Sequence, residues 1–201
     1  MVVCHLLLQA DGEGPYPHLL RRLLRHTNIR NPKALELFRI AVSESSIRWR
    51  FLGFYRIIEF GYLANLLSVI NRDFLKNPAK AAASASEALK NEYDQFTILS
   101  QKIGLDPNFD SLLTEFDGLV RNANTFACAL EHQMESDSRL KRHRGRAAKG
   151  VLVVYLTRCA IVHAGEGALL FESYRDAEFA LSKLISPLES AVLLYLGIES
   201  L

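Results

Sequence analysis

The sequence predicts an all-α fold, a single bundle of five or six helices. The chain has 201 residues, which is enough for one domain with a substantial core. Ala, Leu, Glu, Lys and Arg are plentiful and only six prolines occur, and this composition favours helix over sheet. In several segments the apolar residues recur at steps of three and four, as they do on one face of a helix. We therefore expect helices that pack on helices around one core.

The first predicted helix begins at an Asn-Pro pair. Asn31 suits the N-cap position and Pro32 suits the first helical turn, and the helical pattern continues to about Ser45. A second helix is predicted over about 46–75, and it is apolar on nearly all sides, so we expect it at the centre of the bundle. Its main stripe contains Phe51, Phe54, Ile58, Tyr62 and Leu66.

Two more helices are predicted in the middle of the chain. Asn77-Pro78 restarts the chain, and strong helix formers follow over 79–103, with Gly104 as the C-cap. Asp106-Pro107 then opens a helix that continues to about Glu135.

The last two helices flank a segment with little pattern. The apolar run 151–162 fits a helix or a buried strand by periodicity, and its helical neighbours favour a helix. Residues 168–174 are expected to be irregular or to form a short turn. The final helix covers about 177–195, and Pro187 is expected to kink or divide it.

Composition also predicts where the protein works. No apolar run approaches the roughly 20 residues of a membrane span, and no basic region precedes the short apolar stretch at the N-terminus, so we expect neither a membrane association nor a signal peptide. Three scattered cysteines without C-x-x-C spacing predict neither a zinc site nor disulfides, and they are typical of a reducing cytoplasm. Residues 1–31 are expected to be a poorly ordered N-terminal segment before a helical domain over 32–201.

The most informative pair of residues is Arg158 and His163, at the end of an apolar segment. An arginine offers a fork of donors that matches phosphate oxygens, and a histidine moves protons near neutral pH, so the pair fits chemistry on a phosphodiester. In a straight helix, residues five apart differ by about 140° around the axis and cannot share one face. Either the helix distorts near His163, where Gly165 permits it, or a second copy packs across it.

Glu166 falls between the two on the helical wheel and could orient the arginine or tune the histidine. The structural alternative for the pair is an arginine tied to a carboxylate and a histidine bonded to a backbone carbonyl.

A dense basic run occupies 139–146, directly before the apolar segment. Lys141, Arg142, Arg144 and Arg146 are candidates to contact an RNA backbone. A solvated loop between helices is the equally weighted alternative. The run contains no aromatic residue, so base stacking is not expected there.

Two short stretches resemble the HEPN superfamily (higher eukaryotes and prokaryotes nucleotide-binding). Arg158-Cys-Ala-Ile-Val-His163, in an apolar helix before a glycine-containing turn, resembles its R-x(4–6)-H signature. Phe54-Tyr55-Arg56-Ile57-Ile58-Glu59 is similar to an upstream element of the Apea-like and MauJ-like branches. The likeness extends over about 32–200, although only these two stretches carry it. One departure is Cys159, because the family often has Asn directly after the arginine.

The resemblance implies a metal-independent endoribonuclease without a cofactor, whose active site forms across a homodimer. Arg158 and His163 would be catalytic, RNA would be the substrate, and the protein could be a toxin or an antiviral-defence effector with a cognate antitoxin or other partner protein. Two alternatives stay open: a catalytically silent HEPN-like module that binds a partner protein or nucleotide, and a plain helical scaffold, as the MauJ-like resemblance suggests.

Overall fold

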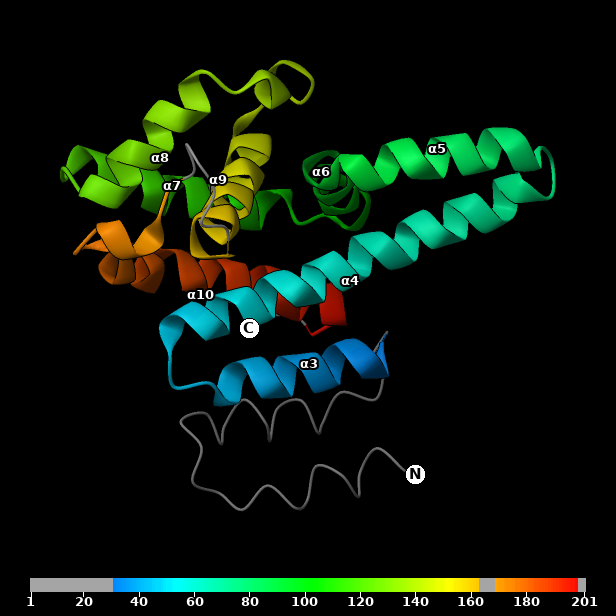
Figure 1. The fold of residues 1–201 in the computed structure, drawn as a ribbon. Coiled ribbons are helices and arrows are strands. Elements are labelled where there is room, and N and C mark those ends of the chain that lie inside the picture. The colour runs from blue at the N-terminus through cyan, green and yellow to red at the C-terminus, as the bar shows by residue number, and fades with distance from the viewer. Residues whose placement is uncertain (1–30, 163–168, 199–201) are drawn as a thin grey trace, which may run out of the picture.

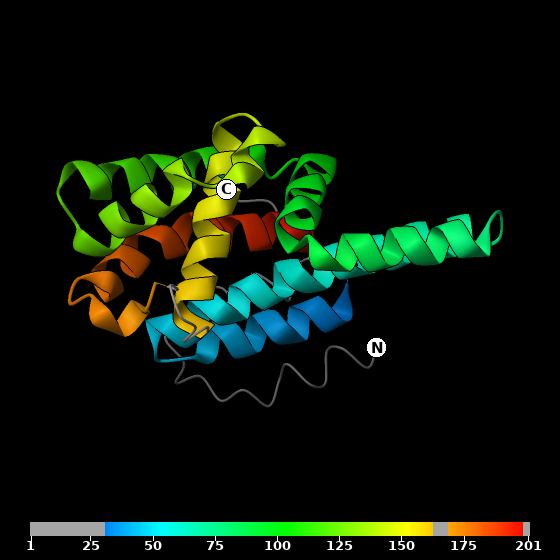
Figure 2. The ribbon, with the colours of Figure 1, turned by 45° about the horizontal axis from the view of Figure 1, so that its top comes forward.

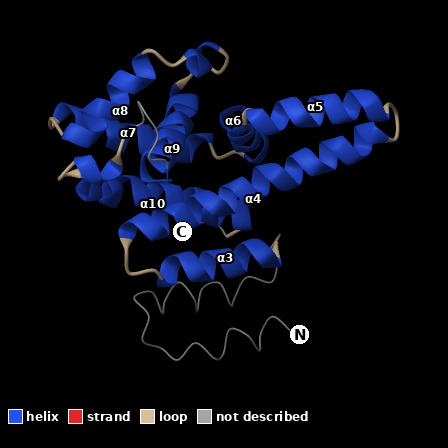
Figure 3. Ribbon diagram, viewed as in Figure 1, coloured by secondary structure: helices blue, strands red, loops and turns tan. Residues whose placement is uncertain are grey.

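The computed structural model describes residues 31–162 and 169–198, and within these ranges every regular element is a helix (Figures 1 and 3). The α-helices are α3 (Pro32–Ser43), α4 (Ile47–Phe74), α5 (Pro78–Lys90), α6 (Glu92–Ile103), α7 (Asp106–Arg121), α8 (Thr125–Glu135), α9 (Arg146–Val162) and α10 (Ala177–Leu196). Two short 3-10 helices, η1 (Ser138–Lys141) and η2 (Phe171–Ser173), lie in the connections. The all-α prediction is confirmed, but the predicted number of five or six helices is wrong, because the described residues contain eight.

The first extra helix arises at Asn91, which divides the predicted helix 79–103 into α5 and α6. Asn91 leaves the helical conformation, with φ −117° and ψ 62°. Its side-chain amide donates to the carbonyl oxygen of Glu87 at 3.1 Å, so it satisfies a carbonyl at the end of α5. Asparagine competes in this way with helical backbone hydrogen bonds, and the chain restarts as α6.

The second extra helix arises at residues 122–124, which divide the predicted helix 106–135 into α7 and α8. Ala123 has a positive φ of 55°, which ends helical continuation. Asn124 then caps the new helix, because its side-chain oxygen accepts from the Ala127 N–H at 2.9 Å.

The remaining helix boundaries lie close to those predicted. Asn31 caps α3 by accepting from two backbone N–H groups, and Gly104 ends α6 with φ 76°. α9 begins at Arg146, five residues before the predicted start, so part of the expected basic loop is helical. Pro187 lies inside α10, which remains one helix and is therefore not divided.

The core forms where α7 packs on both α9 and α10, and α4 packs on α10 and less extensively on α9 (Figures 1 and 2). α9 packs closely on α7 at Gly150, where a Cβ atom would lie 2.1 Å from the carbonyl oxygen of Phe109. Only a glycine permits this approach. The aromatic part of the core includes Phe51, Phe54, Tyr55, Phe96, Phe109 and Phe126.

Helix α4 is central over only part of its length. Its buried residues extend from Phe51 to Leu66, where α3 and α10 lie against it. Beyond that point α4 leaves the body of the protein together with α5 (Figure 1). The prediction that residues 46–75 lie wholly at the centre of the bundle is therefore wrong for the last two turns.

Within the described residues, α10 is the one helix long and apolar enough to cross a membrane by length and composition, and half of its most apolar window is buried inside the fold. The N-terminal segment predicted over 1–31 lies outside the described residues, except for Asn31.

Candidate functional site

Arg158 lies on the last two turns of α9, and its side chain is half-buried. The α9 residues before it are almost all buried, including Val151, Leu152, Val153, Val154, Leu156 and the hydroxyl-bearing Thr157. α9 is described to Val162. His163, Gly165 and Glu166 lie outside the described residues. The structure therefore describes Arg158 but not His163 of the predicted catalytic pair.

The guanidinium of Arg158 lies over the ring of Tyr55 on α4, with 5.5 Å from the guanidinium carbon to the ring centroid. Tyr55 is 1% exposed, and its hydroxyl is buried without a hydrogen-bond partner of good geometry. Burial raises the pKa of Tyr55 strongly, and the neighbouring Tyr62 and Glu92 raise it further. Tyr55 is therefore a neutral phenol at any physiological pH, and it offers Arg158 the face of its ring.

The groups around Arg158 keep it charged. Burial by itself lowers the pKa of Arg158, but Tyr55, Glu92 and the Cys159 thiol raise it, and the net shift is upward. Glu92 belongs to the first turn of α6. Glu92 is thus a nearby carboxylate of the kind that the structural alternative requires. Arg158 is nevertheless half-buried and not enclosed.

A second arginine, Arg139 of η1, reaches the same side of α9. Its guanidinium lies over the ring of Tyr155 at 4.7 Å, and Tyr155 is three residues from Arg158, one turn away on the helix surface. Three hydrogen bonds to the Asp137 carboxylate, from Nε at 2.9 and 3.0 Å and from Nη2 at 2.6 Å, hold Arg139 in place. Burial alone would raise the pKa of Asp137, but Arg139 holds it below its usual value.

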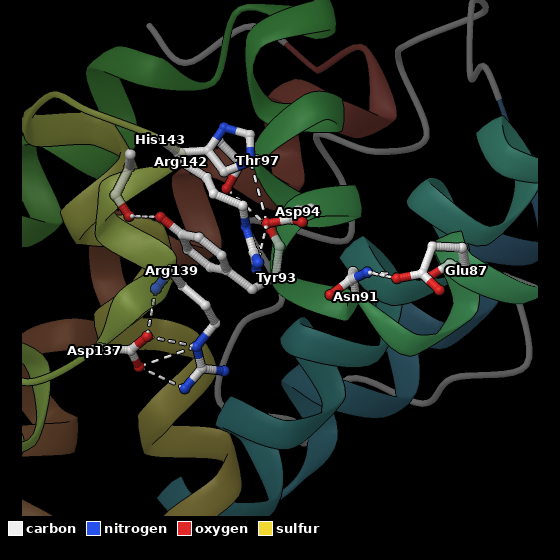
Figure 4. A network of polar contacts seen from close by, with 10 residues as sticks. Glu87, Asn91, Tyr93, Asp94, Thr97, Asp137, Arg139, Arg142 and His143 are labelled. Carbon is white, nitrogen blue, oxygen red and sulfur yellow. Dashed lines mark hydrogen bonds and ion pairs between the residues drawn. The ribbon is translucent and has the colours of Figure 1, made fainter. Parts of the chain in front are cut away.

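The basic loop after η1 is anchored to α6 by Asp94 (Figure 4). Asp94 Oδ1 lies 3.3 Å from Arg142 Nη2 and 3.2 Å from His143 Nε2. The imidazole of His143 also meets the ring of Tyr93 edge to face, with 5.7 Å between the ring centroids. The Tyr93 hydroxyl donates to the carbonyl oxygen of Ala148 at 3.1 Å. Arg142 is thus part of a structural attachment of the loop.

The other predicted RNA contacts lie near the N-terminal end of α9. Lys141 and Arg144 are exposed, and Arg146 lies 3.5 Å from the Asp117 carboxylate. Arg146 and Arg158 are twelve residues apart in one helix, which separates them by about 18 Å along its axis. The structure therefore does not bring these residues together with Arg158 in one compact site. Any common ligand would have to extend along α9.

A polar cavity of about 390 Å³ adjoins the basic loop. Arg144 and Arg146 line it together with the carboxylates of Asp106 and Asp110. One carboxylate oxygen of Asp110 is buried there without a hydrogen-bond partner. Because the cavity carries both charge signs, it is not a simple anion site.

Metal ligands do not cluster in the part of the chain that the structure describes: no three His, Cys, Asp or Glu side chains lie close enough to hold an ion. Cys128 and Cys159 are free thiols there. Arg56 and Glu59, three residues apart on α4, form no ion pair with each other. Arg56 is exposed, and Glu59 instead accepts from the Tyr62 hydroxyl at 3.5 Å.

Sequence reasoning missed the residues that surround Arg158. Tyr55 belongs to one of the stretches that resemble HEPN proteins, but the predicted site contains none of Glu92, Tyr155 and Arg139. Tyr155 stands three residues before Arg158, so helical spacing could have identified it. No local pattern links Tyr55 or Glu92 to α9, because they come from other helices.

No family model, curated protein or solved structure matches this chain.

Proposed function

We propose that this protein is a metal-independent endoribonuclease of the HEPN type, with Arg158 and His163 as its catalytic residues. One observation supports this above the others: the two stretches that resemble HEPN proteins meet through Tyr55 and Arg158. The ring holds a permanently charged guanidinium at the half-exposed end of α9. That is a suitable position for a group that binds a phosphate.

The chemistry needs only the RNA and these side chains. The 2′-hydroxyl beside the scissile phosphate attacks the phosphorus while His163 takes its proton. Arg158 stabilises the additional negative charge of the phosphorane-like transition state. The bond to the 5′-oxygen then breaks, and that oxygen receives a proton. The products are a 2′,3′-cyclic phosphate and a 5′-hydroxyl, and a homodimer would supply the residues that one helix cannot present on one face.

The direct test is to incubate the purified protein with RNA in the presence of a chelator. We expect cleavage that persists with the chelator and disappears in Arg158→Ala and His163→Ala. Arg39→Ala, which removes an exposed arginine of α3, is the matched control and should cleave normally. RNA with 2′-O-methyl groups and DNA of the same sequence should stay intact, because they lack the nucleophile. Intact RNA at high protein concentration would rule the proposal out.

A second candidate function is a catalytically silent helical module that binds a partner protein or nucleotide. The ion pairs of Arg142 with Asp94 and of Arg146 with Asp117 favour it, because they compensate part of the positive charge that would bind an RNA backbone. Cys159, at the position where the family often has Asn, favours it as well. The same assay separates the two candidates, since a silent module binds without producing cyclic phosphate ends.

A further inference from the structure

The last part of α4 and all of α5 form an arm, residues 63–90, that extends away from the body of the protein (Figures 1 and 2). Apart from Leu66 and Ala81, every residue of the arm is at least partly exposed. α5 buries a single residue, Ala81. Helices in proteins are stabilised mainly by the packing of an apolar face, and a helix of 13 residues has little stability by itself. The arm therefore needs more cover than this chain's described residues give it.

One side of α4 in the arm carries a stripe of large apolar side chains. Leu63, Leu67 and Phe74 are 37%, 59% and 50% exposed, and their spacing places them within about 40° of one another around the helix. No charged residue occurs from Gly61 to Asn71. A contiguous exposed apolar surface of this kind is typical of an interface.

The adjacent side of the arm holds a groove of about 610 Å³ that is lined by α4, α5 and part of α6. Small residues of α5, including Ala81, Ala85 and Ala88, form one wall, while Leu66 and Val69 of α4 form the other. An apolar groove between helices accepts the apolar side chains of another helix. The stripe lies about 110° around α4 from the centre of this groove, so the two occupy neighbouring sides of the helix.

We propose that two copies of this chain pair through their arms, with the stripe of each α4 in the groove of the other arm. A two-fold axis permits this arrangement, because it produces two equivalent contacts, each between the stripe of one copy and the groove of the other. The four helices would then form a bundle with the usual apolar interior. A second copy is the occupant that fits, since one arm supplies both the large side chains and the space for them.

The charge of the arm agrees with self-association. The stripe is uncharged, and Asp73, Lys76 and Lys80 bring both signs to the edge of the groove, so identical surfaces meet without a block of like charge.

This pairing does not depend on ribonuclease activity. It would nevertheless place the partner close to Arg158, because Leu63 lies only about 12 Å along α4 from Tyr55.

The first experiment measures the mass in solution over a range of protein concentrations. We expect about twice 22.6 kDa for the unaltered protein. Leu67→Glu should give a monomer at the same concentrations, because each copy would bring an unpaired charge into the apolar contact. Phe179→Glu is the matched control: Phe179 is 58% exposed on α10, against 59% for Leu67, and this variant should remain dimeric. A monomeric unaltered protein would overturn the proposal, and so would a dimeric Leu67→Glu variant.

Hydrogen exchange of the α5 amides provides a second measurement. Protection of residues 82–90 should increase with protein concentration in the unaltered chain and in Phe179→Glu, and it should stay low in Leu67→Glu. Protection that is as high in Leu67→Glu as in the unaltered chain would mean that another segment of the same chain covers the arm, which contradicts pairing. Because neither measurement uses RNA, failure here is distinct from failure of the ribonuclease proposal.

Discussion

The guanidinium of Arg158 lies over the face of the Tyr55 ring, with the guanidinium carbon 5.5 Å from the ring centroid. The contact joins the C-terminal part of α9 to α4, two segments that are far apart in the sequence. An aromatic ring orients a planar cation without neutralising its charge, unlike a carboxylate. The Tyr55 hydroxyl takes no hydrogen bond of good geometry, so the ring is the part of this side chain that serves Arg158.

Tyr55→Phe and Tyr55→Leu should therefore differ sharply in stability. Tyr55→Phe removes a buried hydroxyl that makes no hydrogen bond of good geometry, so the free energy of unfolding should stay unchanged or rise by up to about 1 kcal/mol. Tyr55→Leu loses the ring and the cation contact, and it should lower the free energy of unfolding by about 2–3 kcal/mol. Urea unfolding curves of both variants measure this. A large loss in Tyr55→Phe would mean that the hydroxyl has a stabilising partner.

The protein should lose stability in alkaline solution. Burial raises the pKa values of Tyr55 and Tyr62 well above their ordinary value of 10.0. Above pH 10.0 the unfolded chain loses these protons while the folded protein keeps them, so the free energy of unfolding falls as pH rises, by about 1.4 kcal/mol per pH unit for each residue. Below pH 10.0 both states keep the protons and the effect is absent. Unfolding measured across this range should have a shallower slope in a Tyr55→Phe, Tyr62→Phe double variant, and equal slopes would contradict the assignment.

Gly150 and Gly118 give a matched test of the contact between α9 and α7. A Cβ atom at Gly150 would lie 2.1 Å from the Phe109 carbonyl oxygen, whereas one at Gly118 would meet nothing within 4 Å. Gly150→Ala should push the two helices apart and destabilise the protein by about 3 kcal/mol or more. Gly118→Ala should stabilise α7 by about 0.5–1 kcal/mol, because alanine is the better helix former. Thermal unfolding of both variants checks the prediction, and equal melting temperatures would contradict it.

The basic loop should contribute unequally to RNA binding. Lys141, Arg142 and Arg144 are all exposed, but Arg142 is also paired with Asp94. If RNA contacts the loop, Lys141→Ala and Arg144→Ala should each weaken binding and reduce the slope of log K against log salt by about 0.7. Arg142→Ala should change the slope less, since part of its charge is already compensated. Binding to a short RNA at several salt concentrations measures the slopes. Unchanged slopes in Lys141→Ala and Arg144→Ala would identify the loop as a solvated connection.

Local chemistry predicted many of the helices. Asn31-Pro32 and Gly104 mark a start and an end in the structure where capping preference put them. The breaks at Asn91 and at 122–124 were missed because helix formers surround them and neither contains a proline. A side-chain hydrogen bond at Asn91 and a single positive φ at Ala123 cause these breaks, and neither is a property of composition.

The sequence by itself determined an all-α chain, most helix boundaries, and the position of Arg158 late in a buried helix, because capping and hydrophobic periodicity act over a few residues. Tertiary structure alone decided which other elements surround Arg158: Tyr55 comes from α4, Glu92 from α6 and Arg139 from η1. It also decided that α4 leaves the core after Leu66. Burial stabilises an apolar helix wherever another element of the chain packs against it. Only the tertiary structure determines how far along the helix such elements extend.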